Sequence, residues 1–271
     1  MIRLVALDLD GTLISASLRV SERVKSTIAC ARATGVDFTM VTGRMFQAAR
    51  PFAQAVGIEG PIVCYQGAAT YVVSTGERLF HYPLPAAVTA DVLRLASADG
   101  VRALGYHDDT LYADERDAYT KEYTDLARVE ARVVGSLQDF FQNRVSTKVV
   151  CVTDILKADA YVDRLQAVLG QRAYVTRSQP QFVEVLDRSV NKGRALAAIA
   201  SLYGVRAEET MAVGDSWNDV PLLAAAGFAV AMATGPKELL ANADAVVAGV
   251  ERDGVAEALE RFVLTQQRAR R

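Results

Sequence analysis

The N-terminal segment sets the strongest constraint on how this chain can fold. Residues 2–7 form an almost unbroken apolar run, which predicts a strand buried on both faces of a parallel sheet. The run is followed by Asp8 and Asp10, and residues two apart in a strand point to the same side. Two carboxylates about 4 Å apart repel each other by roughly 4 kcal/mol at an effective dielectric of about 20. Bound Mg²⁺ would remove this conflict, and Gly11 with Thr12 allows a sharp turn directly after the pair.

A simpler interpretation of the same segment stays open at this point. Aspartate and glycine are ordinary turn residues, so the strand could end in a solvated acidic turn without any chemistry. Short motifs of this kind also arise by chance. The rest of the chain has to discriminate between the two interpretations.

Composition excludes several classes of function. The chain has 271 residues, a formal net charge of -2, and 51% hydrophobic against 23% charged residues, which is typical of a soluble globular protein of one large or two ordinary domains. A nucleic-acid partner is not expected, because no Lys/Arg-rich run offers a footprint for a phosphate backbone. The basic residues at 266–271 are expected to form a solvated tail.

The cysteines and the absence of an apolar leader suggest a cytoplasmic protein. Cys30, Cys64 and Cys151 are far apart, lie among apolar neighbours, and are expected to be buried free thiols. No segment resembles a signal peptide, and the longest apolar stretch is well short of the ~20 residues that a membrane span needs. Neither a membrane nor a zinc site is therefore expected, and the sequence leaves the oligomeric state open.

The order of the predicted elements indicates a core interrupted by an insertion. Strand–helix alternation over residues 1–83 predicts right-handed βαβ units, including strands near 36–41 and 61–65 of one parallel sheet. Residues 84–187 instead alternate helices with paired short strands, which is typical of an α+β layer. The βα alternation returns over 188–271. We therefore expect an α/β fold with a Rossmann-like parallel-sheet core at 1–83 and 188–271 and an inserted α+β domain.

Several polar residues occur where predicted strands end or helices begin. Ligands in open parallel sheets bind just outside the carboxyl ends of the strands, so these residues are expected to converge on one edge. The carboxylates can hold Mg²⁺, while hydroxyl, backbone N–H and ammonium groups can surround a phosphoryl group. The same set allows an aspartate to act as a nucleophile. The residues are Asp8, Asp10, Thr42, Gly43, Lys192 and Asp215.

Four motifs in this order resemble those of the haloacid dehalogenase-like hydrolases. They are Asp8–Thr12, Thr42–Arg44, Asn191–Gly193 and Gly214–Asp219. The insertion at 84–187 resembles the large α/β cap of the Cof-type sugar-phosphatase subgroup, type IIB. The resemblance covers essentially the whole chain, and four ordered motifs in matching structural context are far more specific than any one of them.

The resemblance assigns roles to the acidic residues. It implies that Asp8 is the nucleophile that forms an aspartyl-phosphate and that Asp10 is the general acid and then the general base. Asp215 resembles the Mg²⁺ ligand, together with the Asp8 side chain and the Asp10 backbone carbonyl. Asp219 is a further metal-site residue by its spacing, although an acidic residue there would also favour the helix dipole.

The resemblance also implies a cradle for the phosphoryl group. Thr42, the backbone N–H of Gly43 and Lys192 are its expected members, and Asn218 is a further phosphate contact. Arg44 could equally contact substrate or pair with an acidic neighbour.

Two loops depart from the subgroup's usual pattern. In Tyr65–Ala68 a glutamine stands where an asparagine is usual, and Ala231–Gly235 also differs. Neither loop overlaps the four motifs, but both differences weaken the inference of a substrate from the family.

The function expected from these observations is Mg²⁺-dependent hydrolysis of phosphomonoesters of small metabolites, with sugar phosphates as the leading class. A phosphomutase could use the same motifs, so only product analysis separates it from a phosphatase. A phospho-signalling receiver is disfavoured, because receivers lack both the inserted cap and a residue placed like Asp10.

Overall fold

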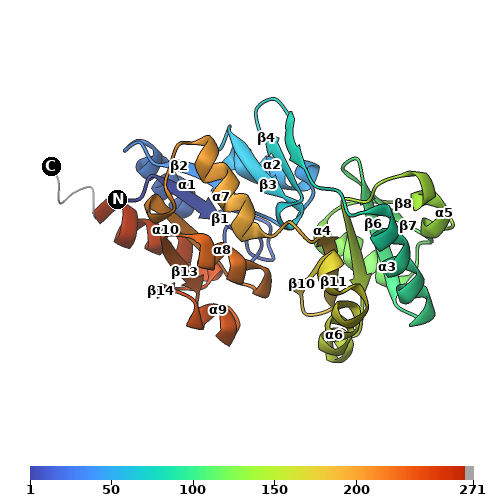
Figure 1. Cartoon of the computed structure of the whole chain (residues 1–271). Helices are drawn as coiled ribbons and strands as arrows, with labels where there is room; N and C mark the ends of the chain where they lie inside the picture. Colours follow the sequence, from blue (N-terminus) through green and yellow to red (C-terminus); the bar gives the residue numbers. More distant parts are fainter. Residues whose placement is uncertain (266–271) are drawn as a thin grey trace. The chain divides into compact units, whose positions relative to one another are not determined.

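The computed structural model describes residues 1–265, which form two compact units (Figure 1). Unit 1 contains Met1–Thr42, Ala49–Leu79 and the residues from Asn191 onward, and unit 2 contains Gly43–Ala48 and Phe80–Val190. The tail expected at 266–271 lies outside the described residues. The assignment of residues 84–187 to a cap stays a prediction.

Unit 1 is built on a parallel five-stranded sheet in the order β14-β13-β12-β1-β2. All four residues of β1 are buried, as expected for a central strand covered on both faces. Leu7 is in register with Val213 on one side and Met40 on the other, so residues from both ends of the chain share one sheet (Figure 1). The strands are β1 (Leu4–Leu7), β2 (Asp37–Met40), β12 (Thr210–Gly214), β13 (Phe228–Met232) and β14 (Ala245–Val247).

Two helices of unit 1, α1 and α7, begin after residues whose side chains accept a hydrogen bond from a backbone N–H group of the first turn. Ser21 caps α1, and its hydroxyl accepts a hydrogen bond from the Val24 N–H at 3.1 Å. Leu4 and Ala6 of the sheet pack in one apolar cluster with side chains of α7 and α8. The helices are α1 (Glu22–Arg32), α2 (Phe46–Ala55), α7 (Lys192–Leu202), α8 (Val220–Ala225), α9 (Lys237–Ala241) and α10 (Gly254–Leu259), and α2 starts within unit 2.

The strand expected near 61–65 forms, but it does not extend the parallel sheet. β3 (Pro61–Cys64) pairs antiparallel with β4 (Ala69–Val72) in a separate three-stranded sheet completed by β5 (Arg78–His81). A single parallel bridge, Val41 to Val63, follows the end of β2. The expectation of a third strand in the core sheet was therefore wrong: beyond this bridge Pro61 has no backbone N–H to donate, and its carbonyl accepts from the Thr39 hydroxyl at 2.9 Å.

Unit 2 contains a six-stranded sheet in the order β10-β11-β9-β6-β7-β8. All its pairs are antiparallel except β7 with β8. Asp108 and Asp109, both with positive φ, make the tight turn between β6 and β7. The strands are β6 (Arg102–His107), β7 (Thr110–Ala113), β8 (Ala131–Val133), β9 (Lys148–Val152), β10 (Ala173–Gln179) and β11 (Phe182–Asp187), and the helices are α3 (Ala86–Ala98), α4 (Ala118–Ala127), α5 (Leu137–Phe140) and α6 (Ala158–Leu169).

The two faces of this second sheet differ in polarity. Val149 and Cys151 of β9 belong to an apolar cluster with α3 and α6. Lys148, on the opposite face by the alternation of a strand, forms a buried ion pair with Glu184 at 2.9 Å. A buried ion pair is weak evidence for stability, because desolvation offsets the attraction between the charges.

Two further expectations can be compared with the structure. Cys64 and Cys151 are buried free thiols, but Cys30 is exposed, so the prediction that all three are buried was wrong. Cys30 lies on α1 outside the buried stripe of that helix. Over residues 1–265, none of the helices combines the length and the hydrophobicity needed to cross a bilayer.

The contact between α7 and α8 depends on Gly193. A Cβ placed there would lie 2.1 Å from the Pro221 carbonyl oxygen, so Gly193→Ala should push the two helices apart. We expect the free energy of unfolding, measured by urea denaturation, to fall by about 1–3 kcal/mol. Ser201→Ala, an exposed position of the same helix, should change it by less than about 0.5 kcal/mol. Wild-type stability of Gly193→Ala would refute the close packing.

Candidate active site

Two carboxylates meet because their strands are parallel neighbours. Asp8 follows β1 and Asp215 follows β12, and β1 pairs with β12 up to Leu7 and Val213. The Asp8 N–H donates to the Val213 carbonyl at 3.0 Å and continues the ladder by one residue. The carboxyl ends of the two strands thus bring Asp8 and Asp215 to the same edge of the sheet.

The turn after β1 folds back onto Asp215. Thr12 donates its hydroxyl to Asp215 Oδ1 at 3.0 Å. Gly11 has a φ of 82°, and a Cβ there would lie 2.1 Å from Asp215 Oδ2, so no other residue fits. The sequence pattern indicated only a turn at Thr12, and its contact with Asp215 was not predicted.

Lys192 joins two of the carboxylates. Asn191 caps α7 by accepting the Arg194 N–H on Oδ1 at 2.9 Å, which fixes Lys192 as the first residue of the helix. The Lys192 ammonium donates to Asp8 Oδ1 at 2.5 Å and to Asp219 Oδ1 at 2.6 Å. Lys192 is 1% exposed, so water screens these interactions little.

The carboxylate of Asp219 is used on both oxygens. Oδ1 accepts from Lys192, and Oδ2 accepts the backbone N–H groups of Asp215 and Ser216, each at 3.0 Å. The contact with Ser216 is half of a capping box. Asp219 therefore caps its helical turn and supports the site at the same time, and it holds the backbone of the loop that carries Asp215.

Burial and mutual repulsion govern protonation in this cluster. Burial and the charges of Asp219 and Asp215 raise the pKa of Asp8 well above its usual range, although Lys192 opposes the change. Burial, together with Asp219, raises the pKa of Asp215 to about 7. Burial alone would lower the pKa of Lys192, but Asp219 and Asp8 outweigh that effect and raise it, so its ammonium group stays charged.

The donor set fits a hard divalent cation. Asp8, Asp215 and Asp219 each present a carboxylate oxygen, and these oxygens lie within 4.8 Å of one another. Three carboxylates against the single ammonium of Lys192 leave surplus negative charge in a buried place, which a divalent cation would neutralise. Because both oxygens of Asp219 are already bonded, Asp8 and Asp215 are the better ligands.

A buried loop links Thr42 to Asn218. Gln66 donates its backbone N–H to the Thr42 carbonyl at 3.0 Å, and its Oε1 accepts from Asn218 Nδ2 at 3.0 Å. Asn218 Oδ1 is buried without a hydrogen-bond partner within the described part of the chain. Gln66 is the residue that departs from the subgroup's pattern, which was the only signal in the sequence for its structural role.

The other predicted residues are placed as follows. Asp10 is partly buried two residues beyond Asp8, outside the group of three carboxylates. Gly43 and Arg44 belong to unit 2, where the Gly43 carbonyl accepts from Lys148 Nζ at 2.9 Å and Arg44 Nη1 donates to the Ala127 carbonyl at 3.4 Å. The roles expected for these residues toward substrate stay predictions.

Comparison with known proteins supports the resemblance seen in the motifs. Residues 5–259 match the family model described as haloacid dehalogenase-like hydrolase. Two curated relatives are a phosphoglycolate phosphatase of Methanothermobacter thermautotrophicus, 28% identical over 96% of this chain and 99% of the relative, and a pyridoxal phosphate phosphatase of Escherichia coli, 26% identical over 94% and 96%.

The fold is similar to that of a solved sugar phosphatase of subclass IIB of this superfamily. The TM-score is 0.84 at 20% identity, and the match covers 96% of this chain and 98% of the other. At that identity the likeness concerns the fold alone, and it confirms the expected α/β class with a parallel-sheet core.

Removal of the buried ammonium tests how much the cluster depends on it. Lys192→Met would leave the carboxylates of Asp8 and Asp219 buried without their shared cation. Breaking a buried ion pair in this way costs about 3–5 kcal/mol, which we expect as a loss in the free energy of unfolding measured with EDTA present. Lys25→Met removes an exposed pair with Glu22 and should leave stability unchanged. Equal effects of the two variants would contradict the central role of Lys192.

Proposed function

Because the chain belongs to the haloacid dehalogenase-like hydrolases, we propose that it hydrolyses phosphomonoesters of small metabolites, with Mg²⁺ as cofactor and Asp8 as nucleophile. The observation that carries this proposal is the buried cluster of Asp8, Asp215 and Asp219 around Lys192. Phosphoryl transfer requires mainly positioning and neutralisation of charge, and the cluster provides a nucleophile, a cation-binding set and a fixed ammonium group.

In the first half of the proposed reaction, a carboxylate oxygen of Asp8 attacks phosphorus. The P–O bond to the alcohol breaks, and Asp10 gives its proton to the leaving oxygen. Lys192 places a positive charge beside the Asp8 carboxylate and holds it in place through the hydrogen bond to Oδ1. The result is an aspartyl-phosphate on Asp8 and a free alcohol.

In the second half, water attacks the phosphorus of the aspartyl-phosphate while Asp10 accepts a proton from it. The bond between phosphorus and the Asp8 oxygen breaks, which releases inorganic phosphate and restores both carboxyl groups. Asp8, Asp215 and the Asp10 carbonyl would hold Mg²⁺, which when bound would offset the negative charge of the phosphoryl oxygens. Thr42, the Gly43 N–H and Asn218 are the proposed contacts to those oxygens.

The substrate class rests on the relatives and on the inserted residues. The two relatives are named for phosphoglycolate and for pyridoxal phosphate, which are both small phosphomonoesters and otherwise unlike each other. This supports the class without selecting one member. We assign the selection to the inserted residues 84–187, which would act as a cap and exclude water during the first step. Sugar phosphates are the first compounds to test.

The nucleophile is tested by Asp8→Asn. The amide is nearly the same size as the carboxylate but cannot form the acyl phosphate, so we expect kcat for phosphate release from sugar phosphates to fall at least about a thousandfold. Asp163→Asn, at an exposed position of α6, is the matched control and should keep wild-type kcat. Near-wild-type turnover of Asp8→Asn would rule out Asp8 as nucleophile, and transfer of the phosphoryl group to sugar in place of water would identify a mutase.

The metal is tested without turnover. Mg²⁺ should raise the midpoint of thermal unfolding of the wild-type protein, since a ligand at a hundred times its Kd stabilises by about 2.7 kcal/mol. Asp215→Asn removes one proposed ligand and should lose most of this shift, and EDTA should reverse it in the wild type. An equal shift in Asp215→Asn and wild type would place the cation elsewhere.

A further inference from the structure

A pocket of about 860 Å³ in unit 2 is lined by three arginines. Arg116, Arg128 and Arg132 belong to its wall, which is formed by the end of α4, the edge strand β8, the β6–β7 turn and the start of α2. Its acidic members are Asp109 and Glu130, so the formal charge of the wall is three positive against two negative.

One of the two carboxylates is already engaged. Asp109 accepts the backbone N–H groups of Phe46 and Gln47, at 2.9 and 3.0 Å, and thereby satisfies the first N–H groups of α2. Its charge is therefore directed toward the helix, and Glu130 is the remaining acidic group against three guanidinium groups.

The three pocket arginines differ from the other arginines of the unit. Across residues 1–265, their side chains make no hydrogen bond and no ion pair. Ion pairs are nevertheless frequent in unit 2, so the lack of partners at the pocket is local. Paired arginines of the unit are Arg94, Arg102, Arg164, Arg172 and Arg177.

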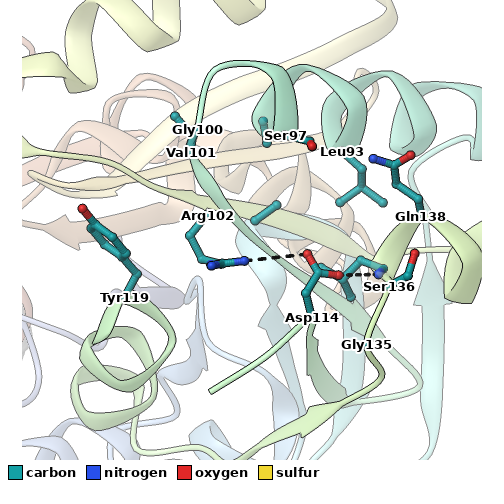
Figure 2. A pocket seen from close by; sticks show the side chains of 13 residues that line it. Leu93, Ser97, Gly100, Val101, Arg102, Asp114, Tyr119, Gly135, Ser136 and Gln138 are labelled. Atoms are coloured by element: carbon teal, nitrogen blue, oxygen red, sulfur yellow. Dashed lines mark hydrogen bonds and ion pairs between the residues drawn. The ribbon is translucent and has the colours of Figure 1, made fainter. Parts of the chain in front are cut away.

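A second pocket of unit 2, of about 320 Å³, shows the contrast directly. Figure 2 shows Arg102 at its wall with the guanidinium directed at Asp114. Guanidinium nitrogens of Arg102 lie 3.9 Å from a carboxylate oxygen of Asp114, 2.7 Å from one of Glu115 and 2.6 Å from one of Asp117. Its charge is fully offset by the protein itself, so this second pocket offers no cation to a ligand.

The backbone at Arg128 is a separate observation. Arg128 ends α4 in the left-handed conformation, with φ 55° and ψ 47°. Glycine is the usual residue at such a position, because a side chain disfavours that conformation. The chain thus carries an arginine where glycine would fold more easily, and that arginine lines the pocket.

We infer that this pocket binds an anionic group of the phosphate or carboxylate class, supplied by the distal end of the substrate. Several unpaired guanidinium groups suit such oxygens, because each can donate two parallel hydrogen bonds. Most residues of the wall belong to the inserted residues 84–187, to which the selection of substrate is assigned under the proposed function. The inference rests on the proposed function, and it specifies substrates that carry a second anionic group.

The first test compares fructose 1,6-bisphosphate with fructose 6-phosphate. The wild-type enzyme should prefer the bisphosphate in kcat/KM. Arg128→Gly and Arg132→Gln should each reduce that preference about tenfold, the loss expected when one charged hydrogen-bond donor is removed. Arg94→Ala, which removes an exposed arginine of α3 outside the pocket, should leave the preference intact. Because glycine suits the backbone at 128, Arg128→Gly should unfold at the wild-type temperature or above it.

The second test measures binding without turnover. Inorganic pyrophosphate is titrated calorimetrically into the Asp8→Asn protein with EDTA present, and the additional change Arg128→Gly should weaken its binding about tenfold. Arginine-dependent binding of pyrophosphate together with arginine-dependent preference supports a distal group of the substrate. Arginine-dependent binding without any preference overturns the substrate source and points to a free anion. If neither pyrophosphate binding nor the preference for the bisphosphate depends on the arginines, the proposed site is overturned. A lack of turnover on every ester would contradict only the proposed function.

Discussion

The candidate active site of this structure depends on one buried ammonium group. Lys192 lies between Asp8 and Asp219, with both contacts close to 2.5 Å and almost no exposure to water. Without it, three carboxylates at the edge of one sheet would repel each other in a low-dielectric environment. Even with it the pKa of Asp8 and that of Asp215 remain raised. The protein alone leaves the cluster undercompensated, which is the electrostatic condition that suits a divalent cation.

The backbone around the cluster is arranged by the same charges. One carboxylate oxygen of Asp219 accepts from Lys192, and the other accepts from the N–H groups of its own loop. The Thr12 hydroxyl donates to Asp215 and orients it. Each proposed metal-binding carboxylate is therefore held by a neighbour that does not itself need the metal. Such support keeps a site in position before its ligand arrives, which reduces the cost of reorganisation during the reaction.

Charged side chains of unit 2 fall into two groups, those paired within the protein and those that line a pocket without a partner among the described residues. Lys148 and Glu184 form a buried ion pair, and Arg102 forms ion pairs with several carboxylates, so these charges are neutralised within the protein. Arg128 and Arg132 form no ion pair within the described residues, and they line a pocket. Unit 2 thus separates structural charges from charges available to a ligand, and a unit that selects substrates by their anionic groups requires that separation.

Local patterns in the sequence determined much of this protein. The apolar run before Asp8 and the βα alternation predicted β1 and the fold class, because short-range periodicity acts within a few residues. Tertiary structure alone decided that β3 leaves the parallel sheet, that Cys30 is exposed and that Asp219 has both oxygens occupied. Strand pairing, burial and hydrogen-bond partners depend on which distant segments meet, and a single sequence does not record those encounters.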